Sequence, residues 1–532
     1  MQTEMSNLAS LLDKACTVSD ASNTKSVIRK VHLLLVKWRD LTPLTGRIVK
    51  FLSSQDILAK KVACLFISRL KHPQDAGLLA INSLLKDTRD PNPLYRGLAL
   101  NTLFDVSSTM EQGVPRLVPA LEDNSAYVRR AAVSCCGKLS RFYPTIVDEL
   151  DLTDKLYAMI RDQDPIVVVQ CLHILDEVLE SEGGITVNKK IAWYLLKQLP
   201  AFHSWGVIGV LECLKKYQPK TSEEALMIVN ALDAYLTSNN VAVQLSAFAL
   251  FRHTIRGRLD HLLREAIGQV WSKLSIQLSF SAQEMAWNIL DWGEEFLLDY
   301  PEVFRPRYRL FYCRFSDSPA LKRKKLAVLQ SLVDKENVFE AADEIFGYCT
   351  DLDRDVCRCA LRTLVSLANQ HEVACEVVRS RVLPLLDVSD EVLVTEVLCA
   401  LCALRFDKKS GSFQERILET VMQRKWSLTS VDAKCGVIDF ISEHGQDFAP
   451  SVYILEDYAA SIEEEDEPVK QSLLGATVKM FFSRPSELQD LLGTVLTALC
   501  KDSNPFVRAQ ANWYYVALLH NVATSKQIVL GS

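Results

Sequence analysis

The sequence lacks the motifs that mark most enzymes and nucleotide-binding proteins. Its 532 residues contain no GxxxxGK[ST] or GxGxxG phosphate loop, no GxSxG nucleophile elbow and no HExxH zinc helix. Nine histidines are dispersed along the chain without evident partners, whereas catalysis requires reactive groups that converge. These absences predict that the protein is not an enzyme, with no catalytic residue and no cofactor.

Long apolar runs are also lacking. No stretch of eighteen apolar residues occurs, and the best candidate, 392–404, contains Glu396 and is typical of a buried helix. The first residues lack the basic start of a secretory signal. We therefore expect a cytoplasmic protein whose contact with membranes is peripheral.

Cysteine is present without the spacing of a disulfide framework. The fifteen cysteines are odd in number and scattered, as expected for reduced thiols in helix cores. The only CxxC joins Cys399 and Cys402, and no second CxxC or histidine pair supplies the further ligands of a zinc site. No metal site is predicted.

Acidic residues are scarce in one segment. Residues 25–71 contain eleven Lys or Arg and two Asp, a net charge of +9, whereas the whole chain has −6 and the remainder therefore −15. The segment has few aromatic residues and the pI is about 5.9, which argue against binding of nucleic acid. Two interpretations stay open, namely an anionic membrane surface or an acidic partner subunit. The candidate membrane-facing residues are Lys25, Arg29, Lys30, Lys60 and Lys61.

One pattern recurs along the sequence, a joint at which one helix ends and the next begins. Leu78, Ile81 and Leu85 form an apolar helical stripe, Asp90-Pro-Asn-Pro breaks the helix, and residues 95–104 resume helical spacing. Similar joints occur at 123–129, 162–168, 238–243, 353–358, 388–393 and 502–508. A helix-turn-helix with a period of about 38 residues predicts an all-α solenoid of HEAT or armadillo type, a curved superhelical trunk of about fourteen repeats. The best candidate for a break in it is 301–318.

Four stretches, in order, resemble the trunk of the beta-adaptins, the beta-type large subunits of heterotetrameric adaptor complexes. They are 79–100, 124–133, 318–326 and 479–490. Within that family, 161–169 followed by 182–184 is most similar to the beta subunits of adaptor protein complex 4. The resemblance implies that residues 1–532 form an adaptin N-terminal trunk.

The resemblance further implies a non-enzymatic vesicle-coat subunit that sorts transmembrane cargo at the trans-Golgi network. Its partners would be an epsilon-type large subunit, a mu medium subunit, a sigma small subunit and an Arf-family GTPase. It would lie peripherally on trans-Golgi network membranes and transport vesicles. The family's GTPase contact corresponds here to Leu78 and Ile81, although both residues could instead be buried between repeats.

The sequence departs from the family in one respect. Beta-adaptins usually continue into a hinge and an ear domain, and neither is recognisable here, so we expect no hinge or ear and assign no recruitment of clathrin or accessory proteins. The alternative from another class is a free HEAT-repeat transport receptor or regulatory scaffold.

Overall fold

A computed structural model describes residues 2–17, 21–37, 40–70, 74–257, 259–388, 390–405, 411–424, 430–446 and 448–530. Within these ranges the chain forms thirty α-helices and no strand, which confirms the predicted all-α class. The chain divides into two compact units, Met1–Val270 and Trp271–Ser532. The division falls inside α16, ahead of 301–318, and the break expected there stays a prediction.

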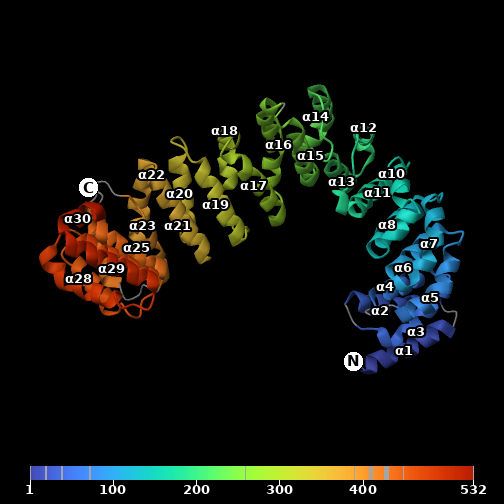
Figure 1. The fold of residues 1–532 in the computed structure, drawn as a ribbon, viewed down its shortest axis with the longest axis horizontal. Helices are drawn as coiled ribbons and strands as arrows, with labels where there is room; N and C mark the ends of the chain where they lie inside the picture. The colour runs from blue at the N-terminus through green and yellow to red at the C-terminus, as the bar shows by residue number, and fades with distance from the viewer. Residues whose placement is uncertain are drawn as a thin grey trace. The chain divides into compact units, whose positions relative to one another are not determined.

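The first unit consists of antiparallel helices that follow one another in chain order (Figure 1). Its helices are α1 Gln2–Thr17, α2 Ala21–Val36, α3 Thr45–Ile48, α4 Ile57–Arg69, α5 Gln74–Asp87, α6 Pro93–Asp105, α7 Ser107–Leu121, α8 Ala126–Phe142, α9 Pro144–Glu149, α10 Leu152–Met159, α11 Pro165–Val178, α12 Lys189–Gln198, α13 Ser204–Leu214, α14 Ser222–Leu236, α15 Val241–Ile255 and the first half of α16 Leu263–Leu278.

The second unit continues the same pattern of paired helices. It contains the rest of α16, then α17 Gln283–Leu297, α18 Pro301–Phe304, the 3-10 segment η6 Arg305–Phe311, α19 Pro319–Leu332, α20 Val338–Tyr348, α21 Arg354–Ala368, α22 Glu372–Val377, α23 Glu391–Cys402, α24 Gly411–Arg424, α25 Val431–His444, α26 Ser451–Ala460, α27 Glu467–Phe481, α28 Pro485–Leu499, α29 Pro505–His520 and α30 Val522–Leu530.

The predicted joints are the turns between the two helices of a pair. At these turns, except the one at Ser125, a side chain caps the second helix by accepting its free backbone amides, as Asp164 does from the amide of Ile166 at 2.8 Å. Proline often follows at the first helical position, where its missing N–H costs nothing, as Pro165 does in α11. Asn92 with Pro93 and Asn504 with Pro505 repeat this arrangement. A polar residue that recurs at the joints is therefore a helix cap.

The second helices of successive pairs form a continuous layer within each unit. In the first unit α2, α4, α6, α8, α11, α13 and α15 pack each on the next, and in the second α17, α19, α21, α23, α25, α27 and α29 do so. Their buried faces are aliphatic, as Leu139 of α8 and Leu175 of α11 illustrate. This layer is the core of the solenoid, since a single pair cannot bury its own apolar face.

Charged side chains connect successive turns at one edge of this layer. Arg129 donates to both carboxylate oxygens of Asp162 at 2.7 Å and, on its other side, to the carbonyls of Asp123 and Asn124 in its own turn. Arg96 holds Asp123 in the same way. Equivalent pairs are Lys60–Asp87, Lys322–Asp351, Arg358–Glu396, Lys434–Glu465 and Lys470–Asp502. This ion-pair ladder sets the register of neighbouring repeats.

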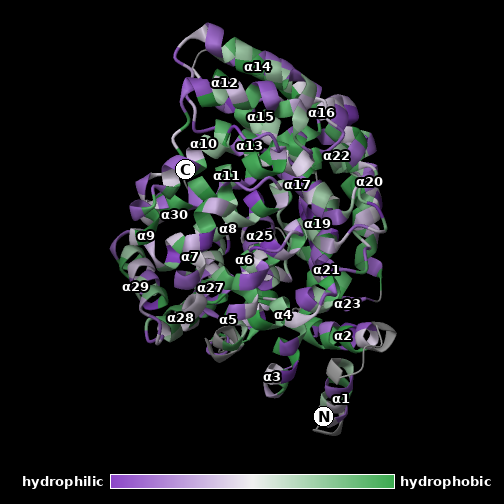
Figure 2. Ribbon diagram, turned by 90° about the vertical axis from the view of Figure 1, so that its right-hand side faces the viewer, coloured by the Kyte–Doolittle hydropathy of each residue, from purple (hydrophilic) through white to green (hydrophobic). Residues whose placement is uncertain are grey.

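Hydrophilic and hydrophobic residues alternate around most helices, as the purple and green segments of Figure 2 show. Each helix therefore has one face for the core and one for solvent. Among the helices in the described ranges, none combines the length and apolarity that a membrane span requires.

Candidate interaction surfaces

Helix α5 carries the two residues expected to contact a GTPase. Leu78 lies in this helix, but its side chain is outside the described residues. Ile81 is half-buried, whereas Ala80 and Leu84 are the core residues of the helix and Leu79 is 65% exposed. Ile81 thus keeps part of its surface accessible, beside rather than within the buried stripe.

The burial of Lys60 corrects the predicted set of membrane-facing basic residues. Its side chain is buried, and its Nζ lies 2.5 Å from Oδ2 of Asp87 at the end of α5. The same ammonium lies 4.7 Å from the ring centroid of Tyr95, whose hydroxyl donates to the carbonyl of Gln55 at 2.6 Å. A buried, paired lysine cannot lie against a membrane, so Lys60 leaves the candidate set and instead joins α4 to α5.

The other four basic candidates are exposed. Lys25, Arg29 and Lys30 lie on α2 and Lys61 lies on α4, two helices that pack against each other. None of the four has a carboxylate partner among the residues that the structure describes. They form the basic surface, defined as Lys25, Arg29, Lys30 and Lys61, and its charge is free to attract an anionic surface or an acidic protein.

Part of the +9 charge of residues 25–71 is neutralised from outside that segment. Asp87 neutralises Lys60, and Asp13 accepts from Nε of Arg47 at 2.9 Å. A count within the segment misses both carboxylates, because they come from helices before and after it. Four of the nine remaining basic residues of the segment belong to the basic surface.

The cysteines whose side chains the structure describes are free thiols. Burial raises the pKa of Cys399 to about 11 and also raises that of Cys402, its CxxC partner on α23. Such thiols stay protonated at neutral pH and are poor metal ligands. No group of three or more metal-ligating side chains gathers in the part of the chain that the structure describes.

Helical pairs stacked one on the next define a class, the helical-repeat proteins. The sequence matches the family described as "Adaptin N terminal region" over residues 2–521. The chain belongs to the adaptin family, and its relatives identify it as a beta-type adaptin.

Several relatives are beta subunits. The chain is 31% identical to the mouse "AP-4 complex subunit beta-1", with 96% of this chain and 69% of that protein covered. It is 28% identical to "Beta-adaptin-like protein A" of Arabidopsis thaliana, over 99% of this chain and 64% of that protein. It is 27% identical to the human "AP-1 complex subunit beta-1", over 95% of this chain and 54% of that protein. The chain thus spans between about half and two thirds of its relatives' length.

A structural neighbour from an adaptor complex shares the fold. A chain in the "Homology model of the full-length AP-3 complex in an intermediate open conformation" superposes with a TM-score of 0.57, covering 96% of this chain and 98% of that chain at 15% identity. At this identity the likeness concerns the fold alone, and it confirms the α-solenoid.

Proposed function

We propose that this beta-type adaptin is a non-enzymatic subunit of a heterotetrameric adaptor complex, of the adaptor protein complex 4 type, that sorts transmembrane cargo at the trans-Golgi network. Its partners are an epsilon-type large subunit, a mu medium subunit and a sigma small subunit. The observation that carries the proposal is the adaptin match along 2–521, together with 31% identity to the mouse AP-4 beta subunit. The protein would be cytoplasmic and bound peripherally to trans-Golgi network and vesicle membranes.

Affinity purification of the tagged chain from cells at native expression tests this assignment. We expect three stoichiometric partners, identified by mass spectrometry as one large, one medium and one small adaptor subunit. The alternative function, a free transport receptor or regulatory scaffold, predicts a chain that elutes alone or with a small GTPase. Recovery of the subunits of another adaptor class would refute the complex 4 assignment and keep the adaptor function.

Recruitment would depend on an Arf-family GTPase bound at α5. The accessible part of Ile81 supports this, since an apolar side chain at the edge of a helix face can be covered by a partner without disturbing the core. The double variant Leu78→Asp and Ile81→Asp should abolish GTP-dependent recruitment to liposomes and leave assembly of the complex intact. Met227→Asp on α14, at a site 57% exposed, is the control and should recruit normally. Failure to assemble would place the α5 residues in the core.

The basic surface would face the anionic membrane. Each basic residue near such a surface contributes on the order of 1 kcal/mol. Replacing Lys25, Arg29, Lys30 and Lys61 with Glu should therefore weaken binding of the assembled complex to phosphatidylserine liposomes more than a hundred-fold at low salt, and remove most of its salt dependence. Lys60 stays unchanged, because its loss would leave Asp87 buried and unpaired.

The control variant reverses two basic charges on a different helix, α12. Lys190→Glu and Lys197→Glu on α12 lower the net charge without touching the basic surface, and should reduce liposome binding only slightly. Unchanged liposome binding together with dissociation of the subunits would show that the basic surface instead meets an acidic partner subunit.

A further inference from the structure

Three large apolar side chains in the second unit are almost fully exposed. Phe315 is 98% exposed, Leu352 97% and Phe280 87%, the three highest values among the large apolar side chains of the described residues. Each lies on the connection between the first and second helix of a pair: Phe280 between α16 and α17, Phe315 in the 312–318 loop before α19, and Leu352 between α20 and α21. Three consecutive connections therefore each present one apolar anchor.

Hydrogen bonds place the first two connections side by side. Nη1 of Arg314 donates to the carbonyl of Ser279 at 2.5 Å, and Nε2 of Gln283 donates to the carbonyl of Ser316 at 2.9 Å. These residues flank the anchors Phe280 and Phe315 in the sequence. The first two anchors thus belong to one edge of the solenoid.

The third connection is joined to the second in the same manner. The amide of Cys313 donates to the hydroxyl of Tyr348 at 2.9 Å, and Nζ of Lys322 lies 2.6 Å from Asp351. Asp351 directly precedes Leu352. All three anchors therefore lie on the same edge, on neighbouring turns.

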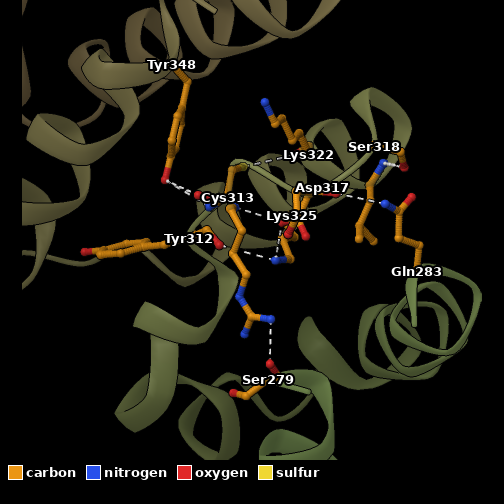
Figure 3. A network of polar contacts seen from close by, with 12 residues as sticks. Ser279, Gln283, Tyr312, Cys313, Asp317, Ser318, Lys322, Lys325 and Tyr348 are labelled. Carbon is orange, nitrogen blue, oxygen red and sulfur yellow. Dashed lines mark hydrogen bonds and ion pairs between the residues drawn. The ribbon is translucent and has the colours of Figure 1, made fainter. Parts of the chain in front are cut away.

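A buried ion pair holds the central loop. The Lys325 and Asp317 side chains are 2% and 9% exposed, with Nζ 2.6 Å from Oδ2, and Lys325 also donates to the carbonyl of Tyr312 (Figure 3). Asp317 in turn accepts from the amide of Arg314 at 2.9 Å. Phe315 is consequently an exposed ring on a loop whose backbone is fixed from within, so little loop entropy would be lost when a partner covers it.

At five other turns in the described ranges, the position of Leu352 is held by proline or a polar residue. Leu352 directly precedes the helix-capping residue Asp353, and the residues in that position at other turns are Pro91, Asn124, Gln163, Asn239 and Ser503. An exposed leucine there contributes nothing to the packing of the repeat. Together with the two exposed phenylalanines on the same edge, it forms a row of exposed apolar side chains, a feature typical of interaction sites.

We propose that Phe280, Phe315 and Leu352 anchor an amphipathic α-helix of a partner protein, laid along this edge of the second unit. Packed helices have axes about 8–10 Å apart, so anchors on successive repeats are separated by about that distance. Residues seven apart on a helix are about 10.5 Å apart. A helix with one apolar residue per heptad therefore meets each anchor in turn.

The charges beside the anchors favour a basic helix over a lipid surface. Exposed Glu284 follows Phe280, and Asp353 and Asp355 outnumber Arg354 beside Leu352. The other exposed basic residues near these connections, Arg314 and Arg323 of α19, lie beside the middle anchor, Phe315. Carboxylates at both ends of the row repel an anionic leaflet and attract lysine or arginine on the flanks of the docked helix.

The test uses two defined probes with the full chain, alone or assembled with its subunits. The first is a fluorescein-labelled synthetic peptide, three heptads long, with leucine once per heptad and lysine on the flanks, followed by fluorescence anisotropy. The second is a vesicle of phosphatidylcholine and phosphatidylserine, followed by sedimentation. The triple variant Phe280→Ser, Phe315→Ser and Leu352→Ser should bind the peptide at least ten-fold more weakly, and Phe315→Ser alone at least three-fold.

Two controls make the result specific. Leu298→Ser, at a site 84% exposed after the end of α17, removes an equally exposed apolar side chain away from the row and should leave peptide binding unchanged. A peptide of the same composition with the leucines out of heptad spacing should bind at least ten-fold more weakly. Equal peptide binding by the triple variant and the unsubstituted chain, equal binding of both peptides, or a loss of vesicle binding in place of peptide binding would each overturn the proposal.

Discussion

Replacement of Arg129 by methionine tests whether the ion-pair ladder stabilises the stacking of repeats. The Arg129 guanidinium makes two hydrogen bonds to Asp162 of the next turn and two to carbonyls of its own turn. The two side chains are 16% and 8% exposed. The substitution keeps the aliphatic stem and removes the charge, so that the carboxylate of Asp162 loses its counter-ion in a largely buried place.

The expected cost follows from this environment. Burial raises the pKa of Asp162, but hydrogen bonds from Arg129 and from the amide of Asp164 outweigh it, so the pKa lies below its ordinary value and the carboxylate is charged at neutral pH. Breaking a buried ion pair costs about 3–5 kcal/mol. Because the Asp164 amide still serves Asp162, we expect a value near 3 kcal/mol at the α8–α11 interface, the low end of that range.

Hydrogen exchange is the appropriate assay, because solenoids open locally and a single unfolding free energy does not describe them. Amides of α8 and α11 should exchange about a hundred-fold faster in Arg129→Met, since each 1.4 kcal/mol is ten-fold. Adding Asp162→Asn should recover part of the loss by removing the unpaired charge. Arg362→Met breaks an exposed ion pair with Asp432 at 3.5 Å, and should change the free energy of local opening by less than about 1 kcal/mol. Strictly additive effects of the two Arg129–Asp162 substitutions would refute the reasoning.

Two further predictions concern other parts of the chain. A hydrogen bond from Lys189 lowers the pKa of Glu224 to about 2, so Glu224→Gln should lower the urea midpoint of unfolding at pH 7. The difference in urea midpoint between this variant and the unsubstituted chain should shrink as pH falls from 4.5 towards 2, because the carboxylate then becomes protonated in both the folded and the unfolded chain. The Trp271 ring stacks on Phe311 with 5.6 Å between the ring centroids. Trp271→Ala should lower the free energy of local unfolding by about 3–5 kcal/mol, measured by hydrogen exchange in residues 301–311. Trp205→Ala, at a site 78% exposed, should lower it by less than about 0.5 kcal/mol.

The sequence by itself determined the features that depend on near neighbours. A cap such as Asp164 acts on an amide two residues away, and Pro165 acts on its own turn, so the joints were readable as turns and their period as a solenoid. The family resemblance was readable for the same reason, because it rests on four local stretches that occur in order. Both the all-α solenoid and the beta-type adaptin were predicted correctly.

Only the tertiary structure decided which side chains are accessible. Two apolar stripes run along α5, and stacking on neighbouring helices buries the one with Leu84 while leaving Ile81 half-exposed, a choice that helical periodicity cannot make. Lys60 was grouped with the exposed Lys61 because its partner, Asp87, lies 27 residues away. The same separation joins Arg96 to Asp123, so the ladder spacing could have revealed the pair.

The three apolar anchors of the second unit illustrate the same limit. Leu352 and Phe315 are large apolar residues set in short polar stretches, and sequence alone does not tell whether such a side chain folds back into the core or stays exposed. Their exposure results from polar bonds between neighbouring connections, such as that from Cys313 to Tyr348, which pair residues 35 apart in the chain. Local spacing specifies the helices and turns of this protein, and the stacking of distant repeats decides which of their side chains a partner can reach.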